Sequence, residues 1–145
     1  MLFGYKIPIN FNMPYVAANI SEFWHRWHIS LSSWLRDYLF IPLGGSRQGE
    51  FKTNRNLLIT MTLGGLWHGA SWSFMVWGLL HGTALVVHRQ FVRLSKNWKG
   101  LEVFFASKVW HIYSILLTFH VVCLCWVFFR VHDIGIAFGI AKRMV

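Results

Sequence analysis

Apolar and polar positions divide the chain into long apolar stretches separated by short basic ones. The central apolar stretch runs from Leu57 to His88 and has no Asp, Glu, Lys or Arg across 32 residues, which is typical of a membrane-embedded segment. One helix of that length would extend about 48 Å, well beyond a ~30 Å hydrocarbon core, whereas two full spans need about 40 residues. The pattern therefore predicts a broken or re-entrant path, with the break at His68 and Gly69.

A second pattern covers Ile20 to Ile41, which we expect to form one or two helices. Asn19 followed three positions later by Glu22 resembles a capping box, and Pro42 ends the element. Its charged residues prevent it from crossing the bilayer as a helix surrounded by lipid alone. It is therefore predicted to lie at the membrane interface or against other helices. Aromatic and apolar residues share one face at helical spacing, and the opposite face is polar: Arg26, Ser30, Ser33 and Asp37.

Two basic stretches, 46–56 and 89–108, are predicted to be loops. The positive-inside rule places both on the cytoplasmic face, so the apolar stretch between them must enter the membrane and return. Trp110 to Val131 has the pattern of a full span, and the tail after it that of an amphipathic helix. Residues 8–14 read as a connector because proline and asparagine interrupt regular structure.

The composition agrees with a membrane protein, since 55% of the residues are hydrophobic and only 13% are charged, against about 25% charged in soluble chains. We therefore predict an all-α, multi-pass integral membrane protein with broken or re-entrant and interfacial helices. The net charge of +9 comes mainly from the loops, where it orients the protein and contacts anionic membrane lipid. There is no nucleic-acid recognition module, so no nucleic-acid partner is expected.

Two histidines are the main candidates for chemistry. His68 lies in the uncharged stretch, where an ionisable group by default indicates a functional site, and His28 lies beside the polar face of the preceding element. A neutral imidazole can act as a general base towards a hydroxyl, and a second histidine or a neighbouring hydroxyl can orient the substrate. For His68 the residues alone leave catalysis and packing both open, and we expect packing for three others: His81, His111 and His120.

Cofactor chemistry is a rival interpretation. His68 and His81 are 13 residues apart, a spacing that on one straight helix could ligate two stacked haems. The matching pair on a second helix is missing, because His111 and His120 are only nine apart. There is no four-ligand cluster of Cys and His for zinc. Neither a metal site nor a bound cofactor is expected.

Three ordered motifs resemble those of a known family. FWHRWHISLSSWLRDYLFIPLGGSRQG, NLLITMTLGGLWHGASWSFMVWGLLHG and VCLCWVFFR closely resemble the membrane-bound O-acyltransferase (MBOAT) family. Within it they are most similar to the bacterial branch with the alginate O-acetylation membrane subunit and the D-alanyl transfer protein of teichoic acid modification. The resemblance covers nearly the whole chain.

The resemblance implies an O-acyltransferase of the cell inner (plasma) membrane. It would move an acyl group, in the first place acetyl, from acetyl-CoA or a carrier-bound acyl donor to hydroxyls of an exported polysaccharide or cell-envelope polymer. Secreted or periplasmic acyltransferase proteins would be its partners. The family's invariant histidine corresponds to His68, the catalytic base, and its second important histidine to His28. Four residues beside them are expected to bind substrate: Arg26, Ser30, Ser33 and Trp67.

Members of this family have several hundred residues. Residues 1–145 are therefore expected to be a partial MBOAT domain, the C-terminal catalytic core without the N-terminal helices. The alternative is a non-catalytic membrane-embedded remnant or subunit that only packs with partner membrane proteins.

Overall fold

A computed structural model describes residues 8–98, 100–131 and 133–144. Within these ranges the protein is all-helical and has no strand, which confirms the predicted fold class in its coarse form. Only α6 among the described helices has the length and hydropathy of a membrane span. The elements, in order, are η1 Pro14–Val16, α1 Ile20–Arg26, α2 Ile29–Leu35, the π-helical turn η2 Arg36–Phe40, α3 Glu50–Trp67, α4 Trp72–Ser95, α5 Glu102–Phe105, α6 Lys108–Arg130 and α7 Ile134–Met144.

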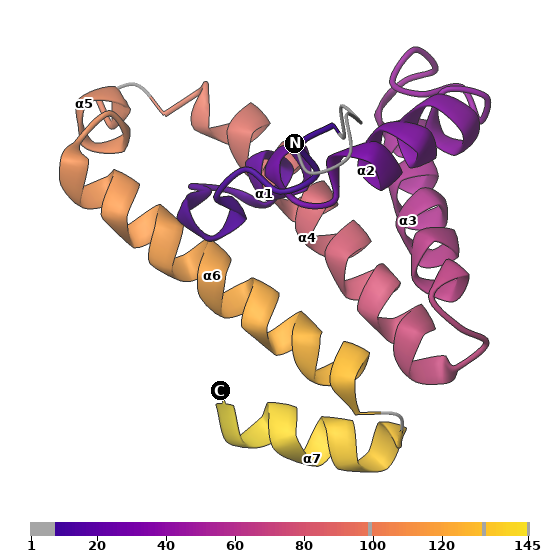
Figure 1. Ribbon diagram of the computed structural model, residues 1–145. Coiled ribbons are helices and arrows are strands. Elements are labelled where there is room, and N and C mark those ends of the chain that lie inside the picture. Colours follow the sequence, from indigo (N-terminus) through magenta and orange to yellow (C-terminus); the bar gives the residue numbers. More distant parts are fainter. Residues whose placement is uncertain (1–7, 99, 132, 145) are drawn as a thin grey trace.

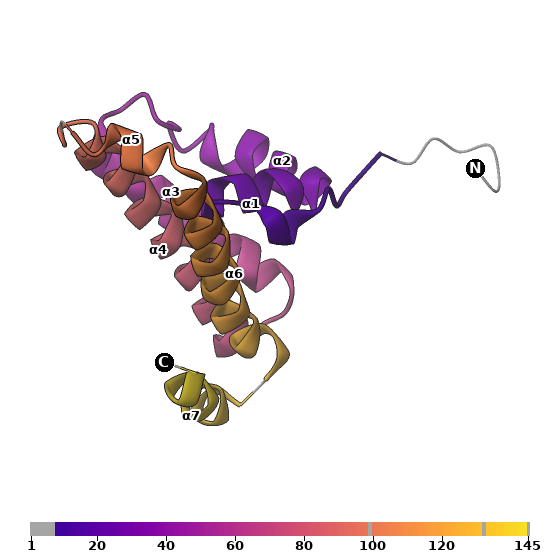
Figure 2. The same ribbon diagram turned by 90° about the vertical axis from the view of Figure 1, so that its left-hand side faces the viewer.

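Three long helices form the body of the molecule (Figure 1). α3 and α4 pack along each other, and α6 approaches α4 towards one end and diverges from it at the other. η1 and α1 fill part of the space between α4 and α6, and α7 crosses beneath them (Figure 2). The short N-terminal helices therefore pack against the sides of the long ones.

The predicted break in the central stretch is confirmed. His68 is the C-cap of α3, and α4 begins four residues after it, with the Ser71 hydroxyl accepting a hydrogen bond from the Ser73 N–H at 3.3 Å. The two helices form a hairpin whose link is residues 68–71. His68 thus lies at the turn of this hairpin, far along the chain from its basic ends.

The predicted extent of the flanking loops was wrong, because both helices continue into polar sequence. α3 begins at Glu50 and α4 ends at Ser95, so the hairpin has helices of about 27 and 36 Å, longer than the apolar run alone allows. Glu50 and Arg93 form an ion pair, and buried Asn56 donates its side-chain N–H groups to the carbonyls of Leu43 and Gly45. Paired polar groups can extend a helix beyond its apolar part. The same ion pair places the beginning of α3 beside the last turns of α4.

Glycines allow α3 and α4 to touch along their backbones. A methyl group on Gly78 would overlap the Met61 carbonyl oxygen, and one on Gly65 would overlap the Phe74 carbonyl oxygen. Gly82 is less tight, with Leu58 Cα 3.2 Å from the position a Cβ would take. Small residues at such crossings are the usual way that membrane helices pack closely.

The first element divides into two helices, as the pattern allowed. The Asn19 side chain accepts from the Glu22 N–H at 2.8 Å, while the Glu22 carboxylate accepts from the Ala18 N–H at 2.9 Å, which confirms the capping box. Its aromatic face is not continuous, since Trp34 and Tyr38 stack on each other but are 47% and 66% exposed. Leu31 and Leu35 are buried instead.

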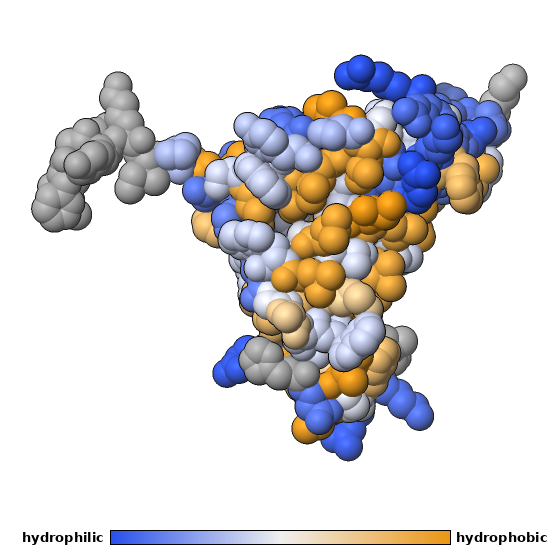
Figure 3. Space-filling view, turned by 90° about the vertical axis from the view of Figure 1, so that its right-hand side faces the viewer, coloured by the Kyte–Doolittle hydropathy of each residue, from blue (hydrophilic) through white to orange (hydrophobic). Residues whose placement is uncertain are grey.

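Aromatic rings from α1 and α4 meet in the core. Phe23 and Trp24 of α1 pack against Trp77 and His81 of α4, with the Trp24 and His81 ring centroids 5.1 Å apart. On the face shown in Figure 3, apolar side chains gather across the middle and hydrophilic ones collect towards the two ends. Such a distribution suits a protein that lies in a bilayer.

Candidate functional site

His28 occupies a strained position in the junction between α1 and α2. Its φ of 43° and ψ of 56° are left-handed, and among the described non-glycine residues only Met13 also has a positive φ. Strain of this kind costs about 1–3 kcal/mol, persists only when surrounding contacts enforce it, and clusters at functional sites. The contacts that hold His28 are therefore part of the site.

The connector before η1 supplies these contacts. The Asn10 carbonyl accepts from the Ile29 N–H at 3.0 Å, and the Asn10 side-chain oxygen accepts from both the N–H and the hydroxyl of Ser30, at 3.0 and 2.6 Å. On the other side of the junction, the Asn12 N–H donates to the Arg26 carbonyl at 2.9 Å. The connector thus binds the chain immediately before and after His28.

His68 is half-buried among aromatic rings. Its ring centroid lies 5.1 Å from that of Trp67, 5.4 Å from Trp77 and 5.1 Å from Phe129, each nearly edge-on. α3, α4 and α6 therefore all contribute to its surroundings. The rings that contact His68 give it an aromatic environment.

The fold brings the two histidines near each other. The two imidazoles are close enough to interact electrostatically, although 40 residues separate them in the chain. A series of ring contacts also connects the two regions, from His68 through Phe129 and Trp126 to Trp27. The Nδ1 atom of His28 is buried and has no hydrogen-bond partner in the described residues. It is available to a group that enters the site.

The four predicted substrate-binding residues do not form one cluster. Arg26 pairs with Glu22 at 2.7 Å and Ser30 bonds to Asn10, so both also hold the fold. Trp67 is 62% exposed and contacts His68 edge-on. Ser33 lines a cavity of about 360 Å³ between α1, α2 and α3. Of the four, only Trp67 has a ring contact with either histidine.

The exposed polar face continues into the π-helical turn. Arg36 donates to the Asp37 carboxylate at 2.8 Å, and this hydrogen bond lowers the pKa of Asp37 from its ordinary value. The Arg36 and Asp37 side chains are 56% and 47% exposed, so the pair adds little to stability.

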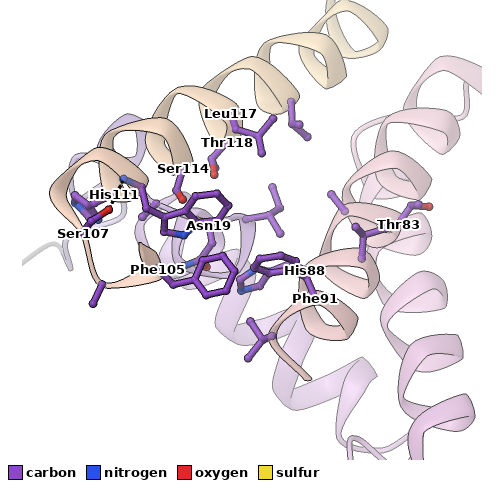
Figure 4. A pocket seen from close by; sticks show the side chains of 18 of the residues that line it. Asn19, Thr83, His88, Phe91, Phe105, Ser107, His111, Ser114, Leu117 and Thr118 are labelled. Atoms are coloured by element: carbon purple, nitrogen blue, oxygen red, sulfur yellow. Dashed lines mark hydrogen bonds between the residues drawn. The ribbon is translucent and has the colours of Figure 1, made fainter. Parts of the chain in front are cut away.

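A larger cavity of about 860 Å³ opens between α4 and α6 (Figure 4). Its walls are mainly apolar, with His88 from α4 and His111 and Ser114 from α6 directed towards it. His28 and His68 line neither this cavity nor the smaller one. The α4–α6 cavity is thus a separate feature of the molecule.

The remaining histidines differ from one another. His81 is fully buried and its Nδ1 accepts from the Trp24 indole N–H at 3.3 Å, which confirms it as a packing residue. His111 and His120 are exposed on α6, so the prediction that they pack was wrong for this chain.

The haem interpretation required His68 and His81 to lie on one straight helix. The two residues lie on opposite sides of the helix break, so the structure does not provide that helix. The described residues contain no cluster of three or more potential metal ligands.

Sequence reasoning missed the residues that position the candidate pair. Asn10 lies in what reads as a plain connector, and Trp77 and Phe129 read as ordinary membrane aromatics. The only available signal was the Asn-x-Asn pattern between prolines, which indicates side-chain bonding to nearby backbone. Its partner, the α1–α2 junction, is 20 residues away.

Comparison with known proteins decides the family. Residues 1–99 match the family model described as MBOAT, membrane-bound O-acyltransferase family. The chain belongs to this family. Both candidate histidines lie within the matched residues.

Relatives extend the match over the whole chain. It is 46% identical over 145 residues to "Peptidoglycan O-acetyltransferase" of Helicobacter pylori, covering 100% of this chain and 26% of that protein. It is 45% identical to "Probable alginate O-acetylase AlgI" of Azotobacter vinelandii, covering 99% and 27%. It is 37% identical to "Teichoic acid D-alanyltransferase" of Streptococcus thermophilus, covering 88% and 34%. The chain therefore spans about a quarter to a third of the length of these relatives.

Proposed function

We propose that this chain is the catalytic core segment of a multi-pass inner-membrane O-acyltransferase that acylates hydroxyls of an exported polysaccharide or cell-envelope polymer. The observation that carries the proposal is the MBOAT match together with a half-buried histidine at a helix break. The relatives are named for three different acceptors, peptidoglycan, alginate and teichoic acid. Hydroxyl-bearing envelope polymers are the class that these acceptors share.

In this proposal His68 is the general base. One nitrogen of its ring takes the proton of the acceptor hydroxyl as the oxygen attacks the acyl carbon. A C–O ester bond forms, the bond from the acyl carbon to the donor breaks, and the leaving group of the donor takes up a proton. The aromatic rings around His68 exclude water from the reacting atoms, which limits hydrolysis of the acyl group.

His28 has the second role. Its buried Nδ1, without an internal partner among the described residues, is suited to hydrogen-bond the acceptor or the developing oxyanion. Acetyl-CoA or a carrier-bound acyl group serves as donor and is a substrate rather than a bound cofactor. Trp67 forms a wall of the site next to His68. Secreted or periplasmic acyltransferase proteins would receive or deliver the acyl group on the outer side.

The test is a His68→Ala substitution in the full-length protein expressed from its gene. We expect acyl ester content of the exported polymer to fall by about 10²–10⁴-fold, the usual value of general-base assistance. The amount of protein in the membrane fraction should stay unchanged, because the substitution adds no polar group to the apolar stretch. His120→Ala is the matched control, since this histidine is exposed on α6 and lines neither cavity.

Two outcomes would contradict the proposal. Normal ester content in the His68→Ala protein would show that this residue is not the base. If the ester content of the polymer were the same with and without the unaltered protein, the alternative would be favoured, a non-catalytic membrane subunit that only packs with partners. This second function is considered because the chain matches only 26% of the length of one relative.

A further inference from the structure

The α4–α6 cleft has one polar wall, although it runs beside the protein's apolar span. Along α6 the side chains that face it include a row at helical spacing of four, three and four: Ser107, His111, Ser114 and Thr118. Thr83 on α4 lies across the cleft from this row. On the rest of α6, exposed residues such as Ile112 and Leu116 are apolar and do not line the cleft. α6 therefore presents two different surfaces.

These two surfaces need different neighbours. Leu116 is 61% exposed and suits lipid tails. The hydroxyls of Ser114, Thr118 and Thr83 have no hydrogen-bond partner within the described chain. Lipid tails offer no partner to a hydroxyl, and such groups in membrane helices usually bond across to a neighbouring helix.

The charge of the cleft adds a second condition. Its lining includes the ammonium group of Lys108 together with the imidazoles of His88 and His111, and it contains no Asp or Glu. Aromatic rings of Phe91, Phe105 and Trp110 close this basic end. A group that fills the cleft is best matched if it carries an acidic or amide side chain near this end.

The length of the relatives indicates where such a group comes from. Their sequences extend well beyond this match, which covers 26% of one relative and 27% of another. In addition, only 17% of the most hydrophobic window of α6 is buried in the structure. Within the described residues, this span is little buried and leaves room beside its polar row.

We propose that the α4–α6 cleft is the docking site of a further transmembrane helix of the same acyltransferase, from the part outside residues 1–145. This helix presents hydrogen-bonding side chains to the row of Ser114 and Thr118, and an acidic or amide side chain to Lys108 and His111. The proposal rests on family membership and on the cleft, and does not depend on the catalytic role of His68.

Site-specific photocrosslinking tests it in the full-length protein in its native membrane. A photoreactive amino acid at Ser114 should crosslink to a peptide from an apolar helix outside residues 1–145 that carries an acidic or amide residue. The same probe at Leu116, two positions away but outside the cleft, should label lipid. A Ser114 probe that labels lipid as Leu116 does would overturn the proposal, as would a crosslink to a second copy of this segment or to an unrelated membrane protein.

A second measurement isolates the hydroxyls. With the probe at Leu117, which also lines the cleft, Thr118→Val should lower the yield of the helix crosslink about threefold, the usual value of one interhelical hydrogen bond. Ile112→Val, on the other face of α6, should leave the yield unchanged. Equal yields in both variants would show that the hydroxyl row does not recognise the helix.

Discussion

His28 can hold its left-handed backbone only because another part of the chain bonds to the residues around it. Asn10 contributes most, with its side-chain oxygen accepting two hydrogen bonds from Ser30 and its carbonyl accepting one from Ile29. Asn12 also contacts the junction, but only through its main chain. The two asparagines therefore make a natural pair for experiment.

We expect Asn10→Ala to lower acyl transfer about tenfold while the protein still inserts and folds, because the two side-chain hydrogen bonds together are worth about 1–3 kcal/mol. Asn12→Ala removes no side-chain hydrogen bond among the described residues and should keep near-normal activity. Ester content of the polymer, measured at equal membrane protein, gives the answer. Equal activity in the two variants would show that the connector does not position His28.

His81 is important for stability rather than chemistry. It is 0% exposed, lies between Phe23, Trp24 and Trp77, and accepts the Trp24 indole N–H. His81→Ala should lower the free energy of unfolding by about 2–5 kcal/mol, because it leaves a cavity and an unpaired buried indole N–H. Thermal unfolding of the detergent-purified protein measures this change. His120→Ala should shift the melting temperature little, and an equal shift in both would contradict the assignment.

At the scale of the elements, the α3–α4 hairpin depends on glycines that let two backbones touch. Gly78 contacts the Met61 carbonyl and Gly65 the Phe74 carbonyl, so neither has room for a side chain. Helices in a membrane gain no hydrophobic driving force from each other and rely on such close packing. The position of His68 follows from it, because the hairpin turn places that residue.

Gly78→Ala should therefore destabilise the hairpin by more than the usual 1–3 kcal/mol of core overpacking, because the clash is with backbone. Gly82→Ala should be milder, since its nearest neighbours are 3.2 Å or more from the added methyl. Gly139→Ala on α7 is the control, having no atom within 4 Å of a new Cβ. Melting temperatures should fall in the order Gly139, Gly82, Gly78. Equal values for all three would exclude the proposed backbone packing.

At the scale of the whole molecule, the arrangement of the long helices predicts which side of the membrane each end of the hairpin faces. Residues 46–49 and 96–98 lie at one end of the hairpin, as the Glu50–Arg93 ion pair requires, and the hairpin turn lies at the other. Both loops are basic, so the positive-inside rule assigns them to the cytoplasm.

Cysteines introduced at Arg47 and Lys96 should both react with an impermeant thiol reagent from the cytoplasmic side of inverted membrane vesicles. A cysteine at Ala70, which is exposed in the hairpin turn, should not react from that side. The unaltered protein, with Cys123 and Cys125 within α6, gives the background. If the cysteines of the Arg47→Cys and Lys96→Cys variants were labelled from opposite sides of the membrane, the hairpin topology would be wrong.

Much of the fold was predictable because local rules control it. The lack of charge from residue 57 to 88 favours a membrane environment, and glycines beside His68 favour a break there. The Asn19–Glu22 capping box forms within one turn, so no distant partner is needed. The helix ends at Glu50 and Ser95 were not predictable, since partners elsewhere in the fold, such as Arg93 for Glu50, pair the polar groups there.

The sequence by itself thus determined the membrane class, the helix break and the identity of the two candidate histidines. Only the tertiary structure decided what surrounds them: aromatic rings from three helices around His68, and Asn10 holding the backbone beside His28. The physical reason is the range of the interactions. Hydrophobicity, capping and helix breaking act over a few residues, whereas the position of His28 relative to His68 depends on packing between segments 40 residues apart.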